Sequence, residues 1–262
     1  MIKSLNKNII YDFNDALYAR DSFSKKLSAI GNGSPKTVRR LKYVLRSAKT
    51  VIAGNEHLAK FATKFNNNVR VVPTTVKFSD YDYQRKNDKE VITIGWIGQS
   101  NNQVYLEELQ KVFIEISTNS PKVILKVISD KPYETKGINI VNIKWDINDY
   151  KSHLYQMDIG IMPLKDDEWS KGKCAIKIIQ YMAAGLPVIA SDEGANASVI
   201  TNAENGYLVK SDKEWIEKLN TLIGSANLRK KMGNTARIKI KRYYSVESWG
   251  DRVERIYLDR LG

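Results

Sequence analysis

The stretch KCAIKIIQYMAAGLPVIAS, residues 173–191, decides the fold class. Residues 174–184 have the apolar spacing of a helix, a Gly-Leu-Pro sequence then breaks it, and a short apolar run follows at 188–191. Another apolar run, DIGIMPL at 158–164, precedes the stretch. A buried strand, a helix and a second buried strand in this order predict parallel strands joined by a right-handed crossover.

The same alternation of strand and helix patterns extends over residues 91–245. Strands are expected at 91–98, 122–129, 138–145, 158–164, 188–191 and 205–209. Helices are expected at 103–117, 147–157 and 174–184 and within 212–245. The pattern predicts one doubly wound, Rossmann-like α/β domain, in which ligands bind beyond the carboxyl ends of the strands. The loops in that position are 98–102, 129–135, 145–148, 163–173 and 191–198.

Residues 1–76 predict an incomplete N-terminal Rossmann-like domain. The strand patterns are at 9–13, 49–55 and 69–73, and the helix patterns are at 35–48 and 56–65. The polar stretch 77–90 predicts a linker between the two domains. A last helix over 246–262, with Ser245 as its N-cap, is expected to pack back toward the N-terminal part.

Composition limits the partners and the compartment. The net charge of +13 and the pI near 9.5 indicate either an anionic partner, such as a phosphorylated small molecule or an acidic membrane surface, or a role in solubility alone. The single cysteine, Cys174, excludes an internal disulfide and fits a reducing compartment. The two histidines, His57 and His153, lack the neighbours of a metal site. Without an apolar run of signal-peptide or membrane-spanning length, we expect a soluble, cytoplasmic protein, with peripheral membrane association left open.

The helix expected at 174–184 carries an unusual polar stripe. Four side chains share one narrow face: Lys173, Lys177, Gln180 and Ala184. A neighbouring face suits the core: Ile176, Ile179 and Ala183. Cations in a first helical turn oppose the helix dipole unless an anion lies there, and lysine offers a mobile charge to phosphate. The two readings are therefore an anion site, with Gln180 bonding sugar hydroxyls, and a solvated surface stripe.

A second candidate anion site is the loop after the strand at 91–98. Gly98, Gln99, Ser100 and Asn101 precede a helix, so backbone N–H groups and the helix dipole favour phosphate there. The sequence has neither G-x-G-x-x-G nor a Walker A pattern. An ordinary strand-to-helix turn is the alternative.

Other residues near expected strand ends have two readings each. Asp12, Asn14 and Asp15 either face a cleft as acceptor contacts or cap a helix in a solvated loop. Trp145 and Tyr133 either stack on a base or pack at the rim of the core.

Several segments share a resemblance to one family. Residues 173–209, KCAIKIIQYMAAGLPVIASDEGANASVITNAENGYLV, resemble the donor-binding motif of glycosyltransferase family 4, the glycosyl transferases group 1. IGWIGQSNNQVYL at 94–106 resembles the opening strand and loop of the same C-terminal domain. Residues 9–18 and 48–76 resemble the end of the family's N-terminal domain, and 228–249 its closing helices.

The resemblance implies the GT-B architecture, with two Rossmann-like domains and a cleft between them. It implies transfer of a sugar, of the hexosyl type, from a UDP- or GDP-sugar to a glycan or lipid-linked acceptor, with retention of anomeric configuration and without a required metal. By position, residues 98–101 would meet the diphosphate, Lys173 and Lys177 would neutralise it, and Gln180 would contact the ribose.

The resemblance also brings in residues that the patterns alone do not. Ile178 lies within the donor-binding helix, and Asn196 lies in a loop whose backbone approaches the donor. The family's first motif glutamate falls at Gly172, and Glu168, in an acidic loop at 166–168, is the nearby carboxylate that could replace it. The resulting catalytic candidates are Lys173, Lys177 and Glu168.

The alternative function is a non-catalytic nucleotide-sugar-binding module, or one half of a split or truncated glycosyltransferase completed by a partner chain. Gly172, Gln180 in place of the second motif glutamate, and the short N-terminal part favour it. Nucleic acid is not expected as a partner, because the sequence has no groove-reading helix motif and no RNP-like aromatic pattern.

Overall fold

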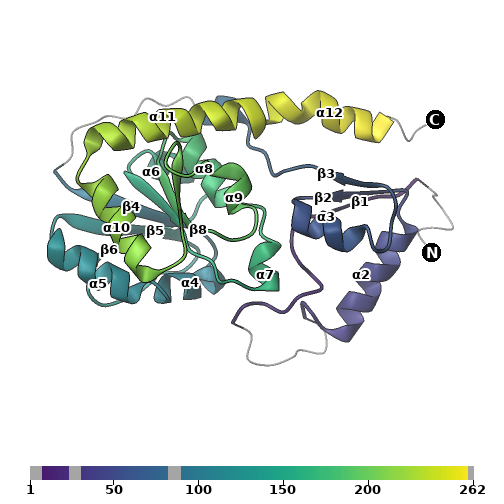
Figure 1. Ribbon diagram of the computed structural model, residues 1–262, viewed down its shortest axis with the longest axis horizontal. Coiled ribbons are helices and arrows are strands. Elements are labelled where there is room, and N and C mark those ends of the chain that lie inside the picture. The colour runs from purple at the N-terminus through teal and green to yellow at the C-terminus, as the bar shows by residue number, and fades with distance from the viewer. Residues whose placement is uncertain (1–7, 24–30, 82–89, 259–262) are drawn as a thin grey trace.

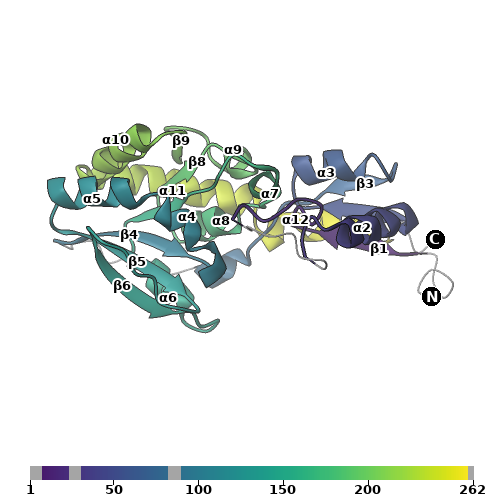
Figure 2. The same ribbon diagram turned by 90° about the horizontal axis from the view of Figure 1, so that it is seen from below.

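The computed structural model describes residues 8–23, 31–81 and 90–258. Two α/β units lie side by side along its long axis (Figures 1 and 2). The first unit is built on a three-stranded sheet and the second on a six-stranded sheet. All the paired strands are parallel.

The six-stranded sheet is doubly wound, as the sequence predicts. Its order is β6-β5-β4-β7-β8-β9. The strands are β4 (Ile92–Ile97), β5 (Val123–Ser129), β6 (Asn139–Lys144), β7 (Ile159–Met162), β8 (Val188–Ser191) and β9 (Gly206–Val209). The chain begins in the middle at β4, moves outward to β6, and then crosses to β7 on the other side of β4. The loops after β4 and β7 therefore diverge, and a crevice at this switch point is the expected ligand site.

Helices cover both faces of this sheet (Figures 1 and 2). On one face lie α4 (Val104–Glu107), α5 (Gln110–Asn119) and α10 (Asp212–Ile223). On the other lie α6 (Tyr150–Leu154), α8 (Ile176–Ala183) and much of α11 (Ala226–Tyr243). The central strands are buried on both sides, which is why their sequences are nearly continuous apolar runs.

The helices differ from the expected ones in three respects. The helix expected at 103–117 is divided into α4 and α5. The helix expected at 174–184 begins at Ile176. Two short helices had no signal in the periodicity, because each is a single turn: α7 (Glu168–Lys171) and α9 (Asn196–Val199).

The first unit follows the expected order of elements. Its strands are β1 (Ile10–Phe13), β2 (Thr50–Ala53) and β3 (Val69–Val71), in the order β1-β2-β3, with α2 (Pro35–Ser47) and α3 (Glu56–Ala62). Ser34 caps α2, and Asn55 caps α3. Its core also includes Trp169, which α7 of the second unit inserts between the two units.

The stretch expected to be a linker is partly folded onto the second unit. Phe78–Tyr81 forms a 3₁₀ turn, and Tyr81, only 2% exposed, packs in the core beneath α6 and α8. The stretch joins the two units, and two aromatic side chains among its charged residues, Phe78 and Tyr81, pack on an apolar surface of the second unit. Residues 82–89 lie outside the described residues.

The last helix, α12 (Val246–Leu258), runs from the second unit back over the first (Figure 1). The Ser248 N–H donates to the Ser245 hydroxyl at 3.1 Å, which confirms the expected N-cap. The Val246 N–H donates to the Val76 carbonyl at 2.9 Å, which ties the start of the helix to the chain between the units. The end of the expected helix, 259–262, lies outside the described residues.

Candidate functional site

A cavity of about 860 Å³ lies at the carboxyl edge of the second sheet. Its walls come from the loops after β4, β5, β6 and β7 and from the beginning of α8. The first unit contributes Asn14, Asp15 and Thr74. The cavity therefore occupies the switch point, where the order of the strands predicts a ligand site.

Lys177 lies in the first turn of α8 and lines this cavity. Its Nζ is 4.4 Å from the centroid of the Trp96 ring. The lysine also lies over the backbone of Gly98: a Cβ added to Gly98 would come within 2.7 Å of the Lys177 Nζ. Gly98 is thus the residue that lets the lysine reach the loop after β4.

The electrostatic environment of Lys177 favours an anionic ligand. Burial, and then the positive charge of Lys173, lower the pKa of Lys177 from 10.5 to about 7. No carboxylate among residues 8–23, 31–81 and 90–258 forms an ion pair with it. A cation that is partly withdrawn from water and has no counterion is unfavourable, and an anion in the cavity would remove that penalty.

Lys173 lies in a different setting from the one expected. It precedes α8 instead of sharing its first turn, because Ala175 takes a left-handed conformation with φ of 56°. Its Nζ is 3.4 Å from the carboxylate of Asp15 of the first unit and 4.4 Å from the centroid of the Trp169 ring. Lys173 therefore joins the two units at the cavity wall, with its charge partly balanced.

The rest of the expected stripe is divided between the cavity and the core. Gln180 lines the cavity one turn beyond Lys177. Ala184 is buried. Ile176, expected in the core, is 40% exposed and lines the cavity, because it is the first residue of α8, at the end of the helix that meets the cavity.

The loop after β4 contributes Gly98, Gln99, Ser100 and Asn101 to the cavity wall. The Ser100 N–H and hydroxyl donate to the carboxylate of Asp130 at 2.6 and 2.9 Å. These hydrogen bonds lower the pKa of Asp130 below its ordinary value. The loop is therefore already organised by an internal anion, so the Ser100 donors that were expected to meet a phosphate are engaged by Asp130.

Three of the expected site residues do not line this cavity. Ile178 is fully buried in the core, on the side of α8 away from it. Asn196 is also fully buried, and its amide donates to the Ser191 carbonyl at 2.9 Å. Glu168 is exposed at the start of α7, with its carboxylate 3.2 Å from His57.

The position of the missing motif glutamate is filled by the first unit. A Cβ on Gly172 would lie 2.6 Å from the backbone nitrogen of Ala16. No side chain fits at residue 172 while the two units pack in this way, so no carboxylate can project from that position.

Several cavity residues were missed or left open by the sequence. Asn14, Asp15 and Trp145 do line the cavity, as one of their two readings required, whereas Tyr133 is buried. Asp130 was missed, although it lies directly after a strand in a loop already marked as a ligand position.

Within the described ranges, no cluster of three or more metal-ligating side chains occurs. Among the same residues, no helix has the length and apolar character that a membrane span requires.

Comparison with known proteins places this site in a family context. A family model described as "Glycosyl transferases group 1" matches residues 88–225. Spore coat protein SA of Bacillus subtilis (strain 168) is 24% identical over 169 residues, which are 52% of this chain and 45% of that protein. The capsular polysaccharide biosynthesis glycosyltransferase CapM of Staphylococcus aureus is 25% identical over 194 residues, 69% of this chain and 49% of that protein. The match thus spans less than half of each relative.

Solved structures share the fold at low sequence identity. Anabaena Alr3699/HepE, determined in complex with UDP and glucose, superposes with a TM-score of 0.71 at 14% identity, covering 95% of this chain and 71% of that one. Sucrose-phosphate synthase from Thermosynechococcus elongatus gives a TM-score of 0.68 at 12% identity, covering 95% and 67%. The expected GT-B-like α/β fold is confirmed.

Proposed function

The chain belongs to the glycosyl transferases group 1 family, and from that premise we propose that its cavity binds a nucleotide-sugar and that the protein transfers the sugar to an acceptor. The donor is a UDP- or GDP-sugar, the acceptor is a glycan or a lipid-linked glycan, and the anomeric configuration is retained. The UDP and glucose in the HepE complex and the capsule-related name of CapM support this choice of donor and acceptor classes.

One observation carries the proposal: Lys177 is a half-buried cation in the wall of a large cavity, and no carboxylate of the described residues forms an ion pair with it. A diphosphate supplies the missing negative charge, and the cavity of about 860 Å³ has the size of sites that enclose drug-sized ligands. The setting between diverging parallel strands is the one in which open α/β sheets bind nucleotides.

The remaining cavity residues suit the other parts of such a donor. Gln180, one helical turn from Lys177, can bond ribose hydroxyls. Trp145, which is 44% exposed at the cavity, offers an aromatic face for a base. Asn14 and Asp15 of the first unit line the cavity beside Cys174 and Lys173 and suit the hydroxyls of the sugar.

Transfer breaks the bond between the anomeric carbon and the diphosphate oxygen, and negative charge develops on that oxygen. Lys177 is placed to stabilise this charge, which is a principal electrostatic contribution to such reactions. Lys173 adds a second positive charge on the same wall, shared with Asp15.

A second candidate function, nucleotide-sugar binding without transfer, rests on Gly172. The Ala16 backbone excludes any side chain at that position, and Glu168 faces His57 outside the cavity. The chain would then be one part of a larger enzyme, completed by further sequence or by a partner chain.

Peripheral docking at an anionic membrane surface is a related proposal. Helix α11 has seven lysines and arginines and no acidic residue in 18 positions, and Ile238 on it is 67% exposed. A basic helix with an exposed apolar side chain is attracted to acidic lipids and would bring the cavity near a lipid-linked acceptor.

A donor screen tests the proposed function. UDP, GDP and their sugars are compared by thermal shift, since a ligand that binds only the folded protein must raise its stability. Donor hydrolysis and transfer are then measured with the ligand that stabilises most. Stabilisation with turnover supports transfer, stabilisation without turnover supports the binding module, and no stabilisation by any of them contradicts both.

A further inference from the structure

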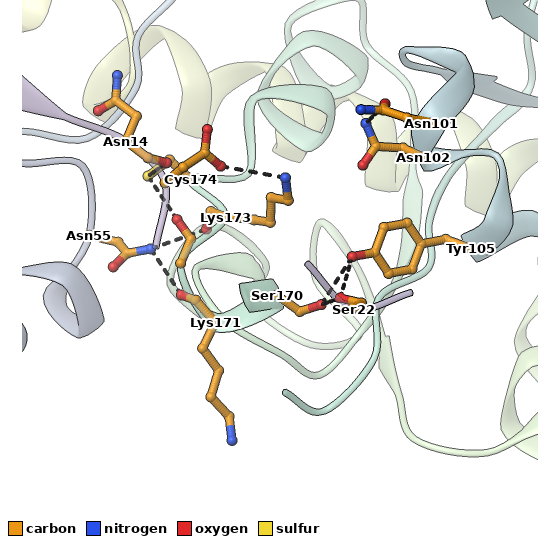
Figure 3. A network of polar contacts seen from close by, with 12 residues as sticks. Asn14, Ser22, Asn55, Asn101, Asn102, Tyr105, Ser170, Lys171, Lys173 and Cys174 are labelled. Atoms are coloured by element: carbon orange, nitrogen blue, oxygen red, sulfur yellow. Dashed lines mark hydrogen bonds and ion pairs between the residues drawn. The ribbon is translucent and has the colours of Figure 1, made fainter. Parts of the chain in front are cut away.

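The turn that leads from the last residue of α7 to α8, residues 171–175, is the place where the first unit meets the cavity wall. Asn55, two residues beyond β2, is 7% exposed and contacts this segment (Figure 3). Its side-chain Nδ2 donates to the carbonyls of Lys171 and Lys173, at 3.1 Å each. Both N–H groups of one buried amide are thus used on a single turn of the other unit.

The oxygen of the same amide has a separate role. Asn55 Oδ1 accepts the Leu58 N–H at 2.8 Å and so caps α3 within the first unit. The side chain therefore connects a fixed helix end in the first unit to two backbone carbonyls in the second.

Two glycines allow the backbones to approach closely at this contact. A Cβ on Gly54 would lie 2.4 Å from the Cys174 sulfur, and a Cβ on Gly172 would collide with Ala16. The Cys174 thiol donates to the Asn14 carbonyl at 3.2 Å. Residues 172–174 are therefore held by the ends of both β1 and β2.

The held turn ends in a conformation that alanine does not favour. Ala175 has φ of 56°, in the left-handed region that is unfavourable for a residue with a Cβ. Such a conformation persists only where neighbouring contacts hold it. Because α8 starts at the next residue, the turn sets the direction of the helix that carries Lys177 into the cavity.

We propose that Asn55 is a positioning residue for the donor site: its paired hydrogen bonds hold the 171–175 turn so that Lys177 reaches the cavity. Through this contact, docking of the first unit sets the affinity of a site whose walls lie mostly in the second. The inference rests on the proposed binding of a diphosphate at Lys177, and it assigns to Asn55 no contact with the ligand.

The two roles of Asn55 can be separated by substitution. Asn55→Asp keeps an oxygen acceptor that caps α3 equally well, but it removes both donors and faces a carboxylate toward two carbonyls. Asn66 offers a matched control, because its Nδ2 donates to the Leu45 and Ala48 carbonyls at 2.8 Å each and its Oδ1 accepts the Asn68 N–H. Asn66→Asp likewise removes two donor bonds and keeps the acceptor, but both of the lost bonds lie within the first unit.

The test measures the affinity of UDP-glucose by calorimetry, with thermal stability recorded for each variant. Asn55→Asp loses two hydrogen bonds that are each worth a few-fold, so its affinity should fall roughly tenfold or more. Asn66→Asp loses two bonds that lie within the first unit, so its affinity should change less than about twofold. Equal affinities in Asn55→Asp and the unchanged protein overturn the inference, as do equal losses in the two variants.

A spectroscopic readout makes the test independent of the ligand. In ¹³C-lysine-labelled protein without ligand, the Lys177 methylenes next to Nζ should be shifted by the Trp96 ring, on which Nζ lies at 4.4 Å. Asn55→Asp should reduce this shift and Asn66→Asp should retain it; retention in both overturns the inference. The proposed function fails separately if Lys177→Met binds UDP-glucose as the unchanged protein does, whatever the Asn55 variant shows.

Discussion

Donor binding should be coupled to protonation of Lys177, and this prediction follows from the structure in quantitative form. Without ligand, burial and Lys173 hold the pKa of Lys177 at about 7. A diphosphate beside the amine stabilises the charged form, so the pKa in the complex should return toward its ordinary value of 10.5. Only the ammonium form attracts the anion, so affinity should be full below pH 7 and fall as the pH rises above it.

The magnitude follows from the fraction of Lys177 that is charged before binding. That fraction falls from about three quarters at pH 6.5 to about 3% at pH 8.5, so Kd should rise roughly 25-fold over this interval. Binding at pH 8.5 should take up nearly one proton per ligand.

Calorimetry with UDP-glucose is the appropriate assay, because its two phosphates keep the same charge from pH 6.5 to 8.5. Titrations in buffers with different heats of ionisation give the proton uptake directly. The Lys177→Met variant, which keeps the apolar stem without the amine, should bind weakly and without pH dependence. A Kd for the unchanged protein that is flat across this range, with no proton uptake, would refute the reasoning.

Three further predictions concern stability, access and the surface. Without ligand, Lys177→Met should raise the free energy of unfolding, measured in urea, by about 1–3 kcal/mol at pH 6.5, because the folded protein no longer holds a charged amine away from water. The gain should shrink toward pH 10, because there the amine of the unfolded chain also loses its proton and the difference between the two states disappears. Gly98→Ala should weaken UDP-glucose binding roughly tenfold or more, because the new methyl group would lie 2.7 Å from both the lysine Nζ and a ring carbon of Trp96; an unchanged Kd would contradict this. Lys241→Glu combined with Arg242→Glu should reduce co-sedimentation with phosphatidylserine vesicles at least about tenfold, at roughly 1 kcal/mol per basic residue near the surface; equal sedimentation of variant and unchanged protein would argue against α11 as the membrane-facing element.

The sequence predicted the elements whose signals are local and extended. Strands such as β5 and β7 are apolar runs bounded by polar turns, and each of them forms close to its expected bounds. The parallel pairing of the strands and the handedness of their connections follow from the alternation of strands and helices, whereas the order of the strands does not. For the same reason the loop after β4 and the start of α8 could be assigned to one edge of the sheet before their geometry was known.

Features set by contacts between distant segments could not be predicted. Periodicity placed Lys173 on the helix, but the left-handed Ala175 is imposed by packing against the first unit, and it moves Lys173 to an ion pair with Asp15. Asp130 organises Ser100 across 30 positions of sequence, and no local pattern indicates such a contact. The motif resemblance placed Ile178 and Asn196 near a donor; both side chains are completely buried, so a contact with the donor through the backbone at these positions stays a prediction.

The account depends on Lys177 as the cationic anchor for a diphosphate, and one comparison of affinities tests this most directly. UDP binding is measured by calorimetry at pH 6.5 for Lys177→Ala and for Lys42→Ala, a lysine on α2 whose amine lies 5.5 Å from the centroid of the Phe65 ring and outside the cavity wall. Loss of a charge-assisted contact should weaken binding about tenfold or more in Lys177→Ala and leave Lys42→Ala within about twofold of the unchanged protein. Equal affinities for the two variants would remove Lys177 from the site and contradict the account.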